Sequence, residues 1–196
     1  MTPEIRAFEY ALGLFTVLIG LAVADVASSF HRLARGPAPV VWDPLALLAA
    51  LFALCMAVGM WFDLWGVRHV ATTRHFFYYL SMVGEFFVLF LIAAASLPDE
   101  VREGCDLRQH YERNRRYFWL LVALFQLSYL ANGLFFIGSM LPRLSFADRL
   151  WTFNGLCVPL IVSLVLATVR SRAVHYAGIT LLFVSFALHY APYQIN

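Results

Sequence analysis

The chain contains no lysine, so its basic side chains are 14 arginines, set against 12 acids in 196 residues. Without lysine it cannot form a Schiff base with retinal or pyridoxal phosphate, which excludes an opsin-like function. The arginines form no clustered basic face on a soluble module, so we expect no nucleic-acid partner. The three cysteines, Cys55, Cys105 and Cys157, show no metal-binding spacing, and two lie within apolar runs, which predicts buried thiols without a disulfide framework.

Charge of either sign is scarce. Only 13% of the residues are charged and 62% are hydrophobic, with a mean hydropathy of +0.74. A soluble domain carries about a quarter charged residues, and a chain of this length keeps too much surface exposed to hide such an apolar excess. The composition therefore predicts an integral membrane protein.

Six apolar segments are long enough to cross the hydrocarbon core, which takes roughly 20 residues of helix. They are residues 8–30, 44–66, 76–97, 117–141, 150–169 and 174–191. Because backbone groups in lipid must be bonded internally, runs of this length are expected to be helices. We predict an all-α protein, a single transmembrane domain over residues 1–196 built as a six-transmembrane-helix bundle.

The arginines are distributed unevenly between the two sides of such a bundle. Nine fall in the connections after the first, third and fifth spans, and five on the other side. The positive-inside rule then predicts that the connections with nine arginines are cytoplasmic and that both termini are periplasmic. The membrane is expected to be the inner (plasma) membrane. The longest of these connections, loop 98–116, ends in DLRQHYERNRR, which is typical of a cytoplasmic helix leading into the fourth span. This loop is either a solvated face or a docking surface for anionic lipid head groups or a cytoplasmic partner.

One acid lies at the centre of an apolar run, Glu85 in YLSMVGEFFVLFL. A carboxylate at this depth is expected to face the bundle interior and to find hydrogen-bond donors. The fourth span offers Gln126, Tyr129 and Asn132 at helical spacing and similar depth, so we expect the third and fourth spans to face each other, with Glu85 bonded to Gln126 or Tyr129. Two hypotheses stay open: Glu85 is a protonatable or ion-coordinating site, or it only bonds the two helices together.

Three further acids lie nearer the ends of the spans. Glu9 and Asp63 are expected near the outer ends of the first and second spans, and Asp25 near the inner end of the first. Together with Glu85 they would place carboxylates at three depths, an arrangement that suits proton or cation passage. Glu9 and Asp25, however, are about 160° apart around a helix and cannot line one face. The alternative is that these three acids are solvated at the membrane surface and take no part in any route.

The sixth span carries a stripe of polar and small residues. His175, Gly178, Leu182, Ser185 and His189 share one helical face, with the two histidines about 21 Å apart. The histidines would line a hydrated cavity or respond to pH at both mouths, or they would bond lipid head groups. No histidine spacing selects a haem-binding pair, so no cofactor is predicted, and the sequence leaves metal binding open.

A proline interrupts the fifth span. Pro159 lacks the amide that would bond the carbonyl of Gly155, which is left free beside Asn154. Broken helices of this kind build ion sites in transporters; the alternative is a simple kink.

Three stretches carry a resemblance to a known group of proteins: FEYALGLFTVLIGLAVADVASSFHRL, MWFDLWGVRH and LPDEV…CDLRQHYERNRRYFW, within residues 7–120. They resemble a family of uncharacterised bacterial multi-pass integral membrane proteins to which no activity is assigned. The resemblance implies a bacterial inner membrane and no mechanism.

The sequence favours conduction or transport of protons, ions or a small solute through an intramembrane polar site centred on Glu85. The residues expected along the route are Glu85, Gln126, Tyr129, Asn132, Asp25, Asp63, His175 and His189. The alternative is a non-catalytic membrane subunit, sensor or scaffold whose buried polar residues are structural. No phosphate-binding loop, HExxH or GxSxG motif is present, so an enzyme is the less favoured hypothesis. Besides membrane lipid, we expect the chain to associate with copies of itself as a homo-oligomer.

Overall fold

The computed structural model describes residues 3–36, 39–67, 76–99, 105–134 and 146–191; of residues 3–11, 65–67, 146–154 and 156 it describes the backbone alone. The expectations for Glu9 and Asn154 concern side chains outside this description. Within these ranges the chain forms six helices. They are α1 (Pro3–Arg35), α2 (Pro44–Val67), α3 (Phe76–Ser96), α4 (Leu107–Asn132), α5 (Phe146–Thr168) and α6 (Arg172–Tyr190).

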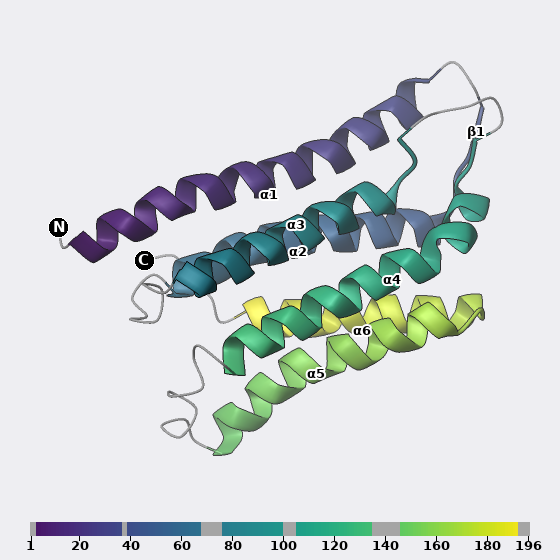
Figure 1. The fold of residues 1–196 in the computed structure, drawn as a ribbon. Coiled ribbons are helices and arrows are strands. Elements are labelled where there is room, and N and C mark those ends of the chain that lie inside the picture. The colour runs from purple at the N-terminus through teal and green to yellow at the C-terminus, as the bar shows by residue number, and fades with distance from the viewer. Residues whose placement is uncertain (1–2, 37–38, 68–75, 100–104, 135–145, 192–196) are drawn as a thin grey trace.

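The helices run alternately up and down in one elongated bundle (Figure 1). The α1–α2, α3–α4 and α5–α6 connections share one end, which we call the arginine-rich end because it holds Arg32, Arg35, Arg108, Arg170 and Arg172. The opposite end is called the far end. In sequence position, each helix lies within a few residues of a predicted span, except that α4 begins ten residues before residue 117 and its predicted outer end lies outside the described residues.

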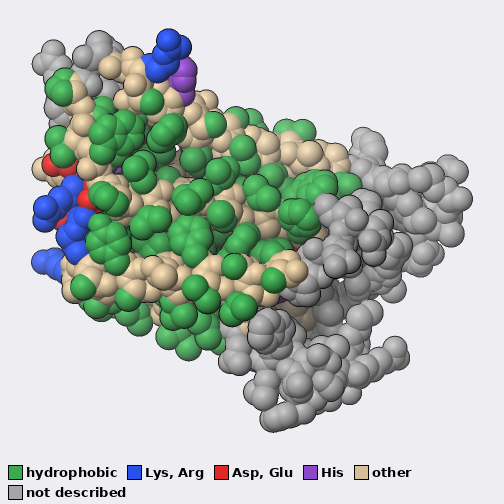
Figure 2. Space-filling view, turned by 180° about the vertical axis from the view of Figure 1, so that it is seen from behind, with side chains coloured by type: hydrophobic (Ala, Val, Ile, Leu, Met, Phe, Trp, Pro, Cys, Tyr) green, Lys and Arg blue, Asp and Glu red, His purple; other side chains and the backbone are tan. Residues whose placement is uncertain are grey.

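Four of the described helical segments are long and apolar enough to cross a membrane: Leu12–Arg35, Pro44–Leu64, Phe76–Ser96 and Arg172–Tyr190. α4 does not qualify because its first turns are rich in charge, and in α5 the apolar segment Cys157–Thr168 is shorter. Apolar side chains cover the middle of the surface while charged ones gather at the arginine-rich end (Figure 2). The all-helical class and the apolar character are as predicted. Of the six predicted spans, the described residues establish four as candidates.

The predicted helix at 106–116 is confirmed, since α4 runs unbroken from Leu107 to Asn132. Asp106 caps it: its Oδ1 accepts from the amide of Arg108 at 2.8 Å and from that of Gln109 at 3.2 Å. Such a cap satisfies amides that have no partner within the helix. Just before it, the two-residue strand β2 (Cys105–Asp106) pairs in parallel with β1 (Val40–Val41), which ties the α3–α4 connection to the α1–α2 connection.

The core consists of interlocking aromatic and small side chains. Phe15 of α1 stacks on Phe86 of α3 with ring centroids 4.8 Å apart. In α2, Gly59 allows the closest approach: a Cβ there would lie 2.7 Å from the Tyr190 hydroxyl and 2.8 Å from the Phe186 ring of α6. A glycine at this position therefore decides how near α6 packs to α2, and with it the geometry of the far end.

Candidate functional site

Glu85 lies inside the bundle, as the cost of a carboxylate in hydrocarbon predicts. It is 3% exposed, and its Oε1 accepts a hydrogen bond of 2.6 Å from the amide Nδ2 of Asn132. The third and fourth helices therefore face each other, with α3 and α4 neighbours along much of their length. The sequence predicted Gln126 or Tyr129 as the partner of Glu85; the hydrogen bond that the structure shows goes to Asn132, about one turn beyond Tyr129.

A pocket of about 80 Å³ opens in the far half of the bundle. Such a volume has room for several water molecules. Four helices contribute its lining. The residues are Phe52, Met56, Met60, Asp63, Phe125, Gln126, Tyr129, Gly155, Pro159, Leu182, Ser185, Phe186, His189 and Tyr190. Most of the polar residues predicted for the far half, Asp63, Gln126, Tyr129 and His189, are thus brought to one place, whereas Glu85 is not among its described lining residues.

Asp63 is the charged group of this pocket. Its Oδ2 accepts from the Tyr190 hydroxyl at 2.8 Å, and its Oδ1 lies 3.8 Å from Nε2 of His189, an ion pair when that ring is protonated. Among the described residues, this buried Oδ1 has no hydrogen-bond partner. Asp63 also lies close enough to Glu85 for their charges to interact. Among the side chains that the structure describes in the far half, Glu85 therefore has one oxygen bonded by Asn132, and Asp63 has one buried oxygen without a hydrogen-bond partner.

Pro159 and Gly155, which the sequence marks as a candidate break, both line this pocket. α5 continues as a helix through the proline. The Ser163 hydroxyl bonds back to the Pro159 carbonyl within the same helix. Pro159 therefore does not break α5, and it lines the pocket together with Gly155.

Asp25 lies away from this pocket, towards the arginine-rich end of α1. It is near enough to Asp99 and Arg32 to interact electrostatically with both. Its Oδ2 is buried without a hydrogen-bond partner among the described residues. The expected series of carboxylates is therefore split: Asp63 and Glu85 lie within electrostatic range of each other, and Asp25 lies towards the arginine-rich end.

His175, the other expected route residue, is 1% exposed and belongs to a buried chain of hydrogen bonds at the arginine-rich end. Trp119 Nε1 donates to the Tyr111 hydroxyl at 3.0 Å, and that hydroxyl lies 2.6 Å from His175 Nδ1. Burial raises the pKa of Tyr111 to about 12, so the phenol keeps its proton and donates to Nδ1. His175 Nε2 then donates to the Val169 carbonyl at 2.9 Å. Every polar atom in this chain is bonded when His175 is neutral.

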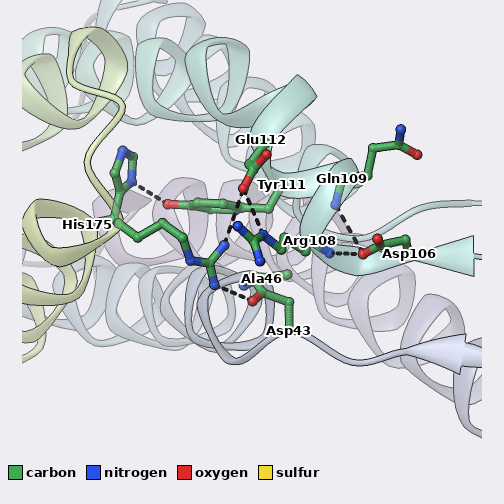
Figure 3. A network of polar contacts seen from close by, with 9 residues as sticks. Asp43, Ala46, Asp106, Arg108, Gln109, Tyr111, Glu112 and His175 are labelled. Carbon is green, nitrogen blue, oxygen red and sulfur yellow. Dashed lines mark hydrogen bonds and ion pairs between the residues drawn. The ribbon is translucent and has the colours of Figure 1, made fainter.

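Ion pairs surround that chain (Figure 3). The Arg172 guanidinium bonds the Asp43 carboxylate and lies 3.6 Å from Glu112, which also pairs with Arg108 at 3.1 Å. Asp43 in addition accepts from the Ala46 amide at 3.3 Å at the start of α2. The network therefore fixes the starts of α2, α4 and α6 against one another.

Sequence analysis missed this network. Its key pairs join residues 129 positions apart (Arg172 and Asp43) and 64 positions apart (Tyr111 and His175). One signal was present: Asp43 directly precedes Pro44 at the start of α2, and Arg172 is the first residue of α6 at the same end. Opposite charges at neighbouring helix starts are candidates for pairing.

Between the two polar regions lies a layer of buried apolar side chains. Phe52 lies 6.2 Å from Trp119 and 5.7 Å from Phe183, measured between ring centroids, and Ile179 and Leu182 fill the α6 side. This layer forms the floor of the far pocket and the roof of the Tyr111–His175 chain. In this structure the two polar regions are separate.

No group of three or more His, Cys, Asp or Glu side chains that could hold a metal occurs among the described residues. No family model matches the chain, and neither a curated protein nor a solved structure matches it. The resemblance to bacterial multi-pass proteins therefore stays a prediction, and the function must be argued from the geometry.

Proposed function

We propose that this chain is a six-span protein of the bacterial inner membrane that moves protons, or a small cation, through the far-half pocket. The observation that carries the proposal is the pair of carboxylates there. Glu85 is buried against Asn132, and its neighbour Asp63 keeps a buried acceptor oxygen without a hydrogen-bond partner among the described residues. A buried unbonded acceptor costs about 1–3 kcal/mol. Binding a proton or cation there would offset this cost.

The way the helices pack supports six spans. α4 and α5 are neighbours within the same bundle as the four apolar helices. With 26 and 23 residues they are about 39 Å and 35 Å long, enough to cross the hydrocarbon core. The arginine-rich end is then cytoplasmic and the far end periplasmic.

In this proposal the far pocket is the periplasmic half of the route. A proton or cation would reach Asp63 between His189 and Tyr190, and pocket water beside Gln126 and Tyr129 would carry it towards Glu85. The layer around Phe52 and Trp119 closes the cytoplasmic half. Passage therefore requires that this layer open, so a gated carrier fits better than an open channel.

A second candidate is favoured by a different observation. The Glu85–Asn132 bond joins α3 to α4, and the bond chain at the arginine-rich end is complete within itself. Both are what a non-catalytic subunit or scaffold would need to hold its helices together. Under this alternative, Glu85 only bonds α3 to α4, and no proton or ion passes through the pocket.

Flux measurements separate the two functions. Purified protein is reconstituted into liposomes containing a pH-sensitive dye, and flux is driven by a proton or a sodium or potassium gradient. Transport predicts flux above that of empty liposomes, with roughly tenfold or greater losses in Glu85→Gln and Asp63→Asn. The matched control is Asp25→Asn, a carboxylate outside the pocket, which should keep wild-type flux.

The scaffold predicts the opposite pattern. Wild-type liposomes would leak no more than empty ones, Glu85→Gln would fold normally, and Glu85→Leu would lose stability because Asn132 loses its partner. Flux that is unaffected by both Glu85→Gln and Asp63→Asn, in variants that elute as folded protein, would refute the proposed route.

A further inference from the structure

A second, larger pocket of about 290 Å³ lies at the arginine-rich end, between the end of α3 and the start of α4. One wall is formed by α3 and the residues that follow it, Leu91, Ala94, Ala95 and Leu97–Asp99. The other wall is formed by α4, with His110, Arg113, Asn114 and Tyr117. Asn114 Nδ2 donates to the Ala95 carbonyl at 2.6 Å. This bond holds the two walls at a fixed separation, so the pocket is built into the packing of α3 on α4.

The pocket carries one charge of each sign. Arg113 is exposed and makes no hydrogen bond or ion pair with any other part of the described chain. Asp99 lies 4.0 Å from Arg32, and because its carboxylate side chain is 71% exposed this ion pair is weak. Both Arg113 and Asp99 lie near enough to His110 to interact with it electrostatically, and all three residues line this pocket. A ligand that matches this lining carries both an anionic and a cationic group.

The surroundings place the pocket at the membrane surface. Tyr117, 51% exposed, stands on the outer face of α4 at the depth where interfacial tyrosines meet lipid head groups. Leu91 and Ala94 continue the pocket along α3 towards the apolar belt. A ligand with a zwitterionic head and an apolar tail would therefore meet polar and apolar walls in the right order.

We propose that this pocket binds the phosphoethanolamine head group of a phospholipid in the cytoplasmic leaflet, with its phosphate at Arg113 and its ammonium group at Asp99. A purely anionic head group would gain from Arg113 but would be repelled by Asp99. A phosphocholine head would fill the pocket, yet its methylated ammonium has no N–H to donate to the carboxylate. The proposal rests on the membrane placement given above and is independent of transport.

The test uses the full chain, purified in mild detergent and stripped of lipid. Native mass spectrometry measures binding of phosphatidylethanolamine, phosphatidylglycerol and phosphatidylcholine with identical acyl chains. We expect phosphatidylethanolamine to bind at least tenfold more tightly than the other two. Arg113→Gln should weaken it roughly tenfold, equivalent to about 1.4 kcal/mol. The matched control, Arg116→Gln, changes an exposed arginine on the same helix outside the pocket and should bind as wild type does.

Asp99→Asn gives the sharper result, because it removes only the group assigned to the ammonium. It should weaken phosphatidylethanolamine binding while phosphatidylglycerol binding stays equal or becomes tighter. Since Asp99 and Arg113 are exposed, both variants are expected to fold, which their elution and melting profiles check. Tighter binding of phosphatidylglycerol than phosphatidylethanolamine by the wild type would overturn the assignment. So would wild-type binding by Arg113→Gln, or displacement of the lipid by equimolar soluble phosphoethanolamine.

Discussion

Replacing Tyr111 with phenylalanine removes one oxygen from the centre of the bond chain at the arginine-rich end. That oxygen accepts from Trp119 Nε1 and donates to His175 Nδ1. Both partners are buried, with Trp119 0% and His175 1% exposed. The variant therefore leaves one donor and one acceptor without a partner while the ring that packs between them remains.

The expected cost follows from these two orphaned atoms. Each buried polar group that loses its partner costs about 1–3 kcal/mol, which gives about 2–6 kcal/mol for the pair. The space left by one hydroxyl is smaller than the roughly 10–15 Å³ that a water molecule needs, so water cannot replace the lost bonds. We expect Tyr111→Phe to lower the free energy of unfolding by about 3 kcal/mol.

The assay is equilibrium unfolding in mixed detergent micelles, with Tyr117→Phe as the control. Tyr117 lies on the same helix and is 51% exposed, so its variant should stay within about 0.5 kcal/mol of wild type. A double-mutant cycle with His175→Leu should show coupling of at least about 1 kcal/mol, because the pair shares a bond. If Tyr111→Phe costs less than about 1 kcal/mol and the cycle shows no coupling, the bond chain is not what holds this end together.

Three further outcomes test other parts of the fold, each by the same unfolding measurement. Gly59→Ala should lower the free energy of unfolding by about 1–3 kcal/mol, because its Cβ would lie 2.7 Å from the Tyr190 hydroxyl of α6. The control Gly155→Ala, whose Cβ would have its nearest atom at 3.7 Å, should leave stability unchanged. Equal effects of the two substitutions would contradict the packing. Burial lowers the pKa of His110 below its ordinary 6.5, so stability should be constant above pH 6.5 and fall below it, and His110→Gln should flatten that fall. An unchanged slope would contradict the burial of that ring. Arg172→Gln should cost about 2 kcal/mol, less than a fully buried pair because that side chain is 30% exposed, and adding Asp43→Asn should recover part of it; additive losses would contradict the pairing.

Span positions could be predicted from the sequence because apolar length is a local property. The second predicted span, 44–66, corresponds to α2 at Pro44–Val67, and the third, 76–97, to α3 at Phe76–Ser96. The inward orientation of Glu85 could also be predicted, since the cost of facing lipid depends on that residue alone. Its partner could not. Choosing Asn132 over Gln126 depends on how far α4 slides along α3, which the core packing of both helices sets.

The polar network at the arginine-rich end shows the other limit. Each of its members has an ordinary local explanation: Asp43 caps α2 and Glu112 forms a pair with Arg108 one turn away. It is the packing of the helices in the folded chain that brings Arg172 next to both Asp43 and Glu112. Helical periodicity placed His175 and His189 on one face of the helix, and that face does point inward. Periodicity alone could not show that His189 lines the far pocket while His175 bonds Tyr111.

The Tyr111–His175 chain and Asp63 differ in how completely their buried polar atoms are bonded, and this difference bears on where a transported species would bind. In the Tyr111–His175 chain every donor meets an acceptor, so adding a proton to His175 would cost it the bond from Tyr111. At Asp63 the situation is reversed: Oδ1 is buried and has no hydrogen-bond partner among the described residues, with His189 3.8 Å away. A carboxylate needed only to tie α2 to α6 would be served by its bond to Tyr190. The remaining oxygen makes Asp63 the expected first binding site for a proton or cation, with Glu85, already bonded to Asn132, as the site beyond it.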